Sequence, residues 1–178
     1  MAYTIVQHQM GLMPIANTDS GVTFANASSA APTPPMKLGM IIRATDPTYG
    51  EAEFILLPGV ASTAIGSLVT YNTTSYTTAL AAVGTNKAQP IAVAMSANVS
   101  ASTWGWYQIS GMAVCKKTCT ISLAANAAVG VLTVGLIAGT GSGKEIQGAL
   151  VAAVASATAG HTTVTVVMNR PHMMGRVT

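Results

Sequence analysis

Short β-type segments recur along most of this chain, and each is bounded by residues that favour turns. Residues 37–44 and 52–57 flank Thr45–Gly50, where Asp, Pro and Gly supply the chemistry of a tight turn. Residues 66–72 and 76–83 repeat the pattern around a turn rich in Thr and Ser. Regular short strands with such breaks are typical of all-β domains. The sequence therefore predicts an all-β fold, a small barrel or sandwich of short antiparallel strands.

Three further strands are predicted in the second half of the chain, at residues 89–96, 104–114 and 162–168. Gly111 marks a bulge or bend within the second of them. The third alternates Thr and Val, as a half-buried strand does. The sequence Asn-Arg-Pro at 169–171 is expected to end it.

The first 36 residues show the period of neither a helix nor a strand. Pro32, Pro34 and Pro35 favour extended backbone. Apolar side chains are nevertheless scattered through this stretch, and they include Ile5, Met10, Leu12, Met13, Ile15, Phe24 and Met36. A solvated linker does not need them. We expect residues 1–36 to form an extended arm that docks on a neighbouring subunit, with a disordered tail as the alternative, and residues 37–178 to form the β-rich body.

Charged side chains are scarce, and this limits the function classes open to the chain. They make up 7% of the residues, against about 25% in typical soluble domains. Such a surface is expected to be covered by partners or by copies of the same chain, or to lie partly in a membrane. The formal net charge of +3 rests on few groups, so no basic stripe is predicted for nucleic-acid binding.

Residues 121–139 carry no charge and approach the ~20 apolar residues that span a bilayer. Asn126 and Thr133 interrupt this stretch, and Gly130 and Gly135 fall at turn-like intervals. These interruptions favour short buried strands over a membrane helix. The membrane helix stays open as the alternative.

The first residues contain no secretory signal, so we expect the chain to be made in a reducing cytosol. Cys115 and Cys119 are then expected to be free, buried thiols. On one strand they would lie ~13 Å apart, too far for a disulfide. A turn through Lys116 and Lys117 could still bring them together.

Motifs that would indicate catalysis are incomplete. The segment 138–145 resembles a phosphate-binding loop, but it begins with Ala138 and has Glu145 where a hydroxyl is needed. It is expected to be a Gly/Ser hairpin loop instead. The three histidines are scattered, and Glu51 and Glu53 are expected to face solvent beside a turn. We predict no enzyme activity, no catalytic or metal site and no cofactor or small-molecule substrate.

The cluster Trp104-Gly-Trp106-Tyr107 is the most distinctive one in the body. Strand alternation places Trp104 and Trp106 on one face and Tyr107 on the other. Buried aromatic side chains contribute strongly to cores, and Trp and Tyr are also enriched at interfaces. These residues are therefore predicted to anchor either the core or an interface.

Several segments together resemble capsid decoration (cement) proteins of tailed bacteriophages. The likeness covers residues 37–111, including KLGMIIRATDPTYGEAEFI, GSLVTYN, IAVAMSAN and WGWYQISG, and a closing strand that ends in NRP. It is weaker over residues 112–160. The motifs are structural, so the resemblance identifies no binding site.

This resemblance implies a β-rich body, commonly trimeric, on the outer surface of a phage head, where it braces neighbouring major capsid subunits. Candidate interface residues are then the arm residues Met10, Leu12, Ile15, Phe24 and Met36, with Trp104, Trp106 and Tyr107 in the body. Two alternatives stay open. One is a membrane-inserted lysis-type protein using residues 121–139, and the other is a low-copy head fibre or adhesin.

Overall fold

The computed structural model describes residues 3–6, 15, 24–25, 34, 36–83, 88–118, 120–141, 143–158, 160 and 162–174. Within these ranges every regular element is a β-strand, which confirms the predicted all-β fold. The strands are β1 (Thr4–Ile5), β2 (Phe24–Ala25), β3 (Ile41–Asp46), β4 (Gly50–Pro58), β5 (Leu68–Tyr71), β6 (Thr78–Leu80), β7 (Ile91–Ala94), β8 (Thr103–Lys116), β9 (Ala128–Thr133), β10 (Leu136–Gly139), β11 (Glu145–Val151) and β12 (Thr163–Met173).

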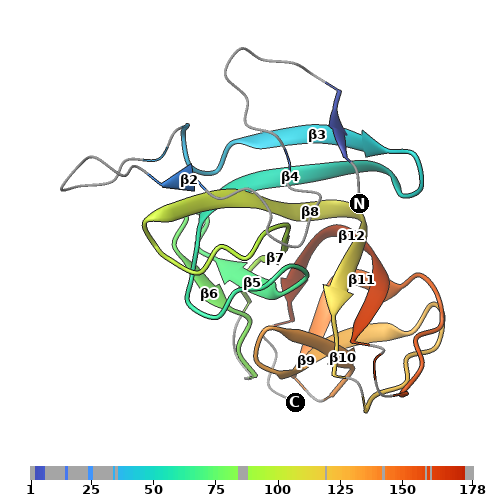
Figure 1. Cartoon of the computed structure of the whole chain (residues 1–178). Coiled ribbons are helices and arrows are strands. Elements are labelled where there is room, and N and C mark those ends of the chain that lie inside the picture. The colour runs from blue at the N-terminus through green and yellow to red at the C-terminus, as the bar shows by residue number, and fades with distance from the viewer. Residues whose placement is uncertain are drawn as a thin grey trace.

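The strands form one antiparallel sheet that bends around the core. Its main path runs β1-β3-β4-β8-β12-β11-β9-β10, while β2 pairs with β8 and β7 joins β5 and β6 to β8. In Figure 1 the long strands β3, β4 and β8 lie side by side across the top, with β5–β7 below on the left and β9–β12 below on the right. The sheet is not closed, so of the two predicted architectures the sandwich-like one is confirmed.

Three buried clusters fill the spaces between the parts of this sheet. The arm cluster lies on one face of β3, β4 and β8 and includes Phe54, Trp106 and the arm residues Tyr3 and Ile15. A central cluster lies between β4–β8 and β5–β7. A larger C-terminal cluster lies between β5–β7 and β8–β12. Strand alternation links the last two, because Leu68 packs into the C-terminal cluster and Val69 into the central one.

Both predicted hairpins are present, and local side chains explain the first turn. The Asp46 carboxylate accepts hydrogen bonds from the backbone N–H groups of Thr48 and Tyr49, at 2.8 and 3.0 Å. Gly50 then takes a positive φ of 73°. Asp near the start of a turn and Gly at its exit favour this geometry. The turn chemistry thus sets the register between β3 and β4.

The bulge or bend predicted at Gly111 is a bulge that lies two residues earlier in β8, opposite β4. The register between the two strands shifts at Glu53 and Phe54, which leaves Ile109 as an extra residue in β8. Gly111 has a φ of +89°, and a Cβ there would lie 2.5 Å from the Glu51 carbonyl oxygen. Only glycine fits both the backbone conformation and this close approach.

We expect Gly111→Ala to lower the free energy of unfolding by about 3 kcal/mol, from left-handed strain and overpacking together. Gly50→Ala is the matched control, because Gly50 also has a positive φ but a Cβ added to it would meet nothing within 4 Å. It should cost about 1 kcal/mol, from strain alone. Urea denaturation measures both. Equal losses would contradict a role for the close approach.

Two sequence expectations about strand ends are wrong. Asn169–Pro171 does not end β12, which continues to Met173, because the three residues form a bulge opposite Gly148. A bulge tolerates proline, since no ladder hydrogen bond is needed there. The segment 138–145 is not a hairpin loop either. It joins β10 to β11, which lie on opposite sides of β9.

Residues 121–139 contain β9 and β10, as the buried-strand interpretation predicted. Among the described residues, none forms a helix with the length and apolar character needed to cross a membrane. Cys115 is a free, buried thiol, and burial raises its pKa to about 12. Lys116 continues β8 rather than starting a turn. Cys119 lies outside the described residues.

Candidate protein-interaction surface

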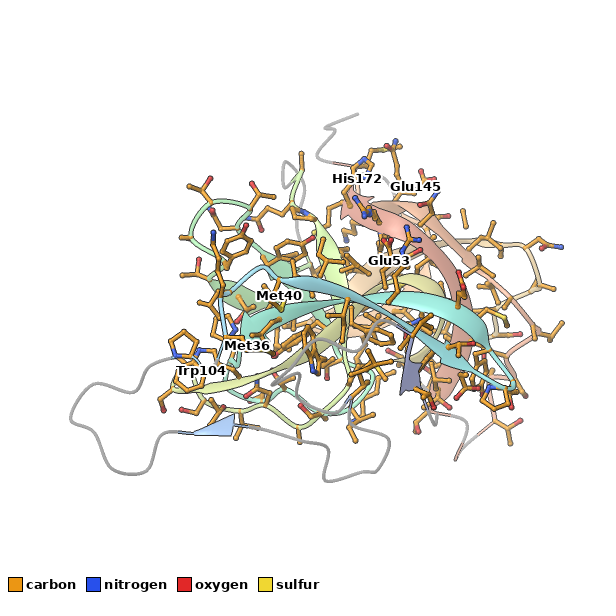
Figure 2. The ribbon with its side chains drawn as sticks, turned by 90° about the horizontal axis from the view of Figure 1, so that it is seen from above. Met36, Met40, Glu53, Trp104, Glu145 and His172 are labelled. Carbon is orange, nitrogen blue, oxygen red and sulfur yellow. The ribbon has the colours of Figure 1, made fainter. Side chains whose placement is uncertain are left out.

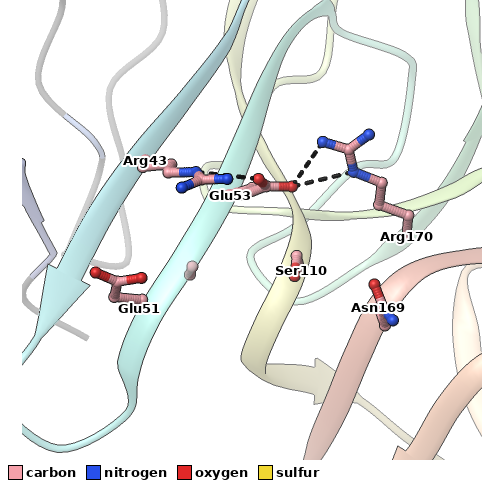
Figure 3. A pocket seen from close by; sticks show the side chains of 7 residues that line it. Arg43, Glu51, Glu53, Ser110, Asn169 and Arg170 are labelled. Atoms are coloured by element: carbon pink, nitrogen blue, oxygen red, sulfur yellow. Dashed lines mark hydrogen bonds and ion pairs between the residues drawn. The ribbon is translucent and has the colours of Figure 1, made fainter. Parts of the chain in front are cut away.

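A polar row crosses four neighbouring strands on the exposed side of the sheet. Strand register aligns Arg43 of β3 with Glu53 of β4, Glu53 with Ser110 of β8, and Ser110 with Asn169 of β12. Aligned residues of antiparallel strands share a face. These four residues, with Arg170, line an open hollow of about 410 Å³ (Figure 3).

Glu53 holds the row together through both of its carboxylate oxygens. Oε1 accepts a hydrogen bond from Arg43 Nε at 3.2 Å. Oε2 accepts bonds from Arg170 Nε and Nη2 at 3.1 and 3.0 Å. The arginine side chains are 65% and 62% exposed and that of Glu53 only 16%. Ion pairs this exposed contribute about 0–1 kcal/mol each, so the row orients its side chains more than it stabilises the fold.

The bulge in β12 positions Arg170 for this contact. Arg170 has a φ of +44°, a left-handed conformation that is unusual for a residue with a side chain. Both Asn169 and Arg170 therefore line the same hollow, although they are consecutive in a strand. The expectation that Glu53 faces solvent is wrong, because its side chain is only 16% exposed and both of its carboxylate oxygens accept hydrogen bonds from arginines. Arg170 lies 117 positions away in the sequence, so no local pattern indicates this pair.

An uncharged surface adjoins this row on the same side of the sheet. Register aligns Met112 of β8 with Val167 of β12, Val167 with Leu150 of β11, and Leu150 with Ala128 of β9. The next row pairs Val114 with Thr165. We call these six residues the outer face: Met112, Val114, Ala128, Leu150, Thr165 and Val167.

The outer face is apolar and accessible at the same time. Val167 is 40% exposed and its cross-strand neighbour Leu150 is 39% exposed. Met112 and Val114 are half-buried, and Ala128 is exposed. Among the described residues that the strand register aligns with it, the charged ones lie at its two ends, with the Glu53 row at one and Lys116 at the other. An apolar centre with a polar rim is the usual anatomy of a protein–protein contact.

The aromatic residues predicted as anchors are all buried. Trp104 and Trp106 lie in the arm cluster and Tyr107 in the central cluster, which confirms the predicted division between two faces. Their exposed fractions are 3%, 2% and 1%. Of the two roles predicted for them, the structure places them in the core role.

The described arm residues pack on the chain's own body. Ile15 is 5% exposed within the arm cluster, and Met36 is partly buried against it. Figure 2 shows Met36, Met40 and Trp104 gathered at one end of the sheet. The backbone of Phe24 pairs with Trp104. Met10 and Leu12 lie outside the described residues, so their part in an interface stays a prediction.

Tyr3 is a residue that the sequence patterns did not single out. Its ring meets Phe54 edge-on with centroids 4.8 Å apart, and its hydroxyl donates to the Met112 carbonyl oxygen at 2.9 Å. Gln108 Nε2 donates to the same carbonyl at 2.9 Å. Burial raises the pKa of Tyr3 from 10.0 to about 12, because the charged phenolate is disfavoured away from water. These contacts fasten the start of the chain to β8.

Chemistry-bearing side chains do not converge elsewhere in the described ranges, where no group of three or more His, Cys, Asp or Glu residues could hold a metal ion. No protein-family model, no curated protein and no solved structure matches the chain. The outer face and its polar rim are therefore the features from which a function is argued.

Proposed function

We propose that this chain is a structural protein of a phage virion, a decoration protein that binds the outer surface of the head in many copies. In this proposal it assembles as a trimer and braces neighbouring major capsid subunits. The observation that carries the proposal is the outer face, an uncharged and accessible sheet surface built from four strands, which supports a chain that assembles with other protein chains, its own copies included. A surface of this kind is suited to contact with protein.

Two sequence properties support the same function. Charged residues make up only 7% of the chain, which fits a molecule whose surface is largely covered after assembly. The resemblance of residues 37–111 to decoration proteins points to the same setting. Many weak contacts on one shell then act together, because each bound copy raises the effective concentration of the next contact.

The composition of purified particles tests this function directly. Denaturing gel densitometry of gradient-purified virions gives the number of 18.0 kDa chains for each major capsid subunit. A copy number of the same order as that of the major capsid protein supports a decoration protein. A trace band would instead indicate a fibre or tail component, and absence from the particles would contradict a virion function.

The arm is proposed to make the contact with the shell. Val6 and Ile15 are both placed on the body, by the Val6 N–H bond to Arg43 and by burial of Ile15. The sequence between them contains Met10 and Leu12 and carries no Asp, Glu, Lys or Arg. Such a segment supplies apolar anchors at positions that are tied to the body on both sides.

We expect the double variant Met10→Lys/Leu12→Lys to lose at least about tenfold in affinity for shells that lack the protein, since two apolar anchors each contribute about 1 kcal/mol or more. Co-pelleting with such shells measures the loss. Leu132→Lys is the matched control, because Leu132 is a 39% exposed apolar residue of the body. Unchanged pelleting of the double variant would contradict the role of the arm.

A further inference from the structure

An acidic side chain outside the Glu53 ion pairs, Glu51, lies at one end of the outer face, and a basic side chain, Lys116, lies at the other. Glu51 shares a face of β4 with Glu53, and its backbone passes so close to Gly111 that its carbonyl oxygen would lie 2.5 Å from a Cβ there. Lys116 is the last residue of β8, and it lies on the same face of the strand as the outer-face residue Val114. Neither side chain makes an ion pair with any residue in the described part of the chain. Within the described residues, the face therefore has Glu51 outside any ion pair at one end, where Arg43 and Arg170 are both paired with Glu53, and Lys116 outside any ion pair at the other.

This arrangement is complementary to itself. Five residue steps from Gly111 to Lys116 span about 17 Å, and their midpoint falls between Ala113 and Val114, beneath the apolar rows. A two-fold axis that passes over that midpoint, in the plane of the contact and perpendicular to β8, brings a second copy face to face with the first and reverses the direction of its strands. Lys116 of each copy then lies over Glu51 of the other, while the apolar rows meet in the middle. A two-fold interface uses the same patch on both subunits, so the patch must be complementary to itself, as this one is.

We propose that the outer face pairs with the outer face of a second copy of this chain. The contact consists of the apolar rows around Val114 and Val167, closed at both ends by a Glu51–Lys116 ion pair between copies. It rests on the proposed function only for its setting, because on a shell it would join copies that belong to neighbouring trimers.

The size of the face sets how strong this pairing is in solution. Four strands about 4.8 Å apart over a length of about 17 Å give a flat area of roughly 250–300 Å². A stable interface buries about 800 Å² on each partner. Pairing in dilute solution is therefore weak, and neighbouring copies on a shell would be held together by their high local concentration.

Charge reversal tests the pairing. Sedimentation velocity up to protein concentrations of about 0.5 mM, where weak association is populated, should show a reversible dimer contact. Lys116→Glu alone or Glu51→Lys alone should weaken it at least about tenfold, because each places two like-charge pairs in the interface. The double variant should restore it to within about threefold, since the ion pairs are rebuilt with reversed signs. Failure of the double variant to restore pairing would overturn the proposal.

A cysteine near the axis gives a second test that does not depend on charge. In a Cys119→Ser background, Val114→Cys should form a disulfide-linked dimer under mild oxidation, because the two copies of residue 114 meet at the axis. Val154→Cys is the control, since Val154 is 73% exposed and lies outside the outer face. Faster linking at residue 154 than at residue 114 would overturn the proposal.

Pelleting with shells separates this inference from the proposed function. The Lys116→Glu variant, if it fails to pair but still attaches, supports both the function and the separate pairing contact. Wild-type chain that pairs but never attaches to shells overturns the function and leaves the pairing intact.

Discussion

Replacement of Lys117 by methionine is expected to destabilise the fold strongly, and more than the substitutions of Glu51 or Lys116 described above. Lys117 is 2% exposed, and its Nζ donates hydrogen bonds to three backbone carbonyls. The acceptors are Thr118, Ile121 and Ser156, at 3.3, 3.1 and 2.8 Å. The ammonium thus joins the loop after β8 to the loop after β11. Methionine fills a similar volume but leaves these carbonyls without this donor.

We expect Lys117→Met to lower the free energy of unfolding by about 2–4 kcal/mol, because a charged donor is lost from three part-buried carbonyls, at about 1–3 kcal/mol each, while the cost of burying the ammonium is removed. For a chain of this length, that corresponds to a fall in Tm of roughly 5–15 °C. Thermal and urea denaturation measure it.

Lys116→Met is the matched control, because Lys116 is the adjacent lysine and its side chain is half-buried at the surface. It should change stability by less than about 0.5 kcal/mol. Equal effects of the two substitutions would show that the three carbonyl contacts do not stabilise the fold.

The same pair of lysines shows where sequence reasoning reached its limit. The sequence leaves open a turn through the two consecutive lysines between Cys115 and Cys119, as the alternative to one continuous strand. In the structure, strand alternation continues through them, so Lys116 points outward and Lys117 inward. Two of the carbonyls that accept from Lys117 are local, but the third, that of Ser156, comes from a loop 39 positions further along the chain. No local pattern carries that information.

Features that depend on local chemistry were predictable. Asp46 and Gly50 identified the first hairpin because the turn needs a side-chain acceptor and a positive φ. The alternation through Trp104, Trp106 and Tyr107 placed them on two faces because the strand period is two. The end predicted at Pro171 was wrong for the converse reason. A partner strand with Gly148 accommodates the proline in a bulge, and the pairing cannot be read from β12 alone.

The sequence predicted that a protein-interaction surface exists, but it did not predict which residues form it. Scarce charge indicated that some of the surface would be covered, but not which part. Val167 and Leu150 become neighbours only through the register between β12 and β11, and Met112 joins them through the register between β12 and β8. The outer face is thus a property of strand order, which sequence periodicity does not determine.

Replacement of Tyr3 by alanine is expected to have an effect of similar size to that of Lys117→Met, in a residue that lies in the predicted arm. Tyr3 is 6% exposed and packs with Phe54 and Trp106 in the arm cluster. Truncating a buried aromatic side chain costs about 3–5 kcal/mol, from lost burial and the cavity left behind. If Tyr3 instead served only to dock on a neighbour, the isolated chain would lose nothing.

Thr4→Ala and Tyr3→Phe separate the contributions. Thr4 is exposed in β1, so its loss should cost less than about 0.5 kcal/mol. Tyr3→Phe keeps the ring on Phe54 but removes the hydroxyl that donates to Met112, a loss of about 1 kcal/mol. Urea denaturation of the isolated chain should therefore rank the variants Tyr3→Ala, Tyr3→Phe and Thr4→Ala in order of decreasing loss.

The pH dependence of Tyr3→Phe provides an independent check. The pKa of Tyr3 is raised by burial from its usual 10.0 to about 12, so the folded chain holds this proton more tightly than the unfolded chain does. The corresponding stability is fully present below pH 10 and is lost as pH rises toward 12. The wild-type chain should lose stability more steeply than Tyr3→Phe across that range. Parallel curves would mean that the hydroxyl is not buried against β8, and the arm would then be free to bind a neighbour with its first residues as well.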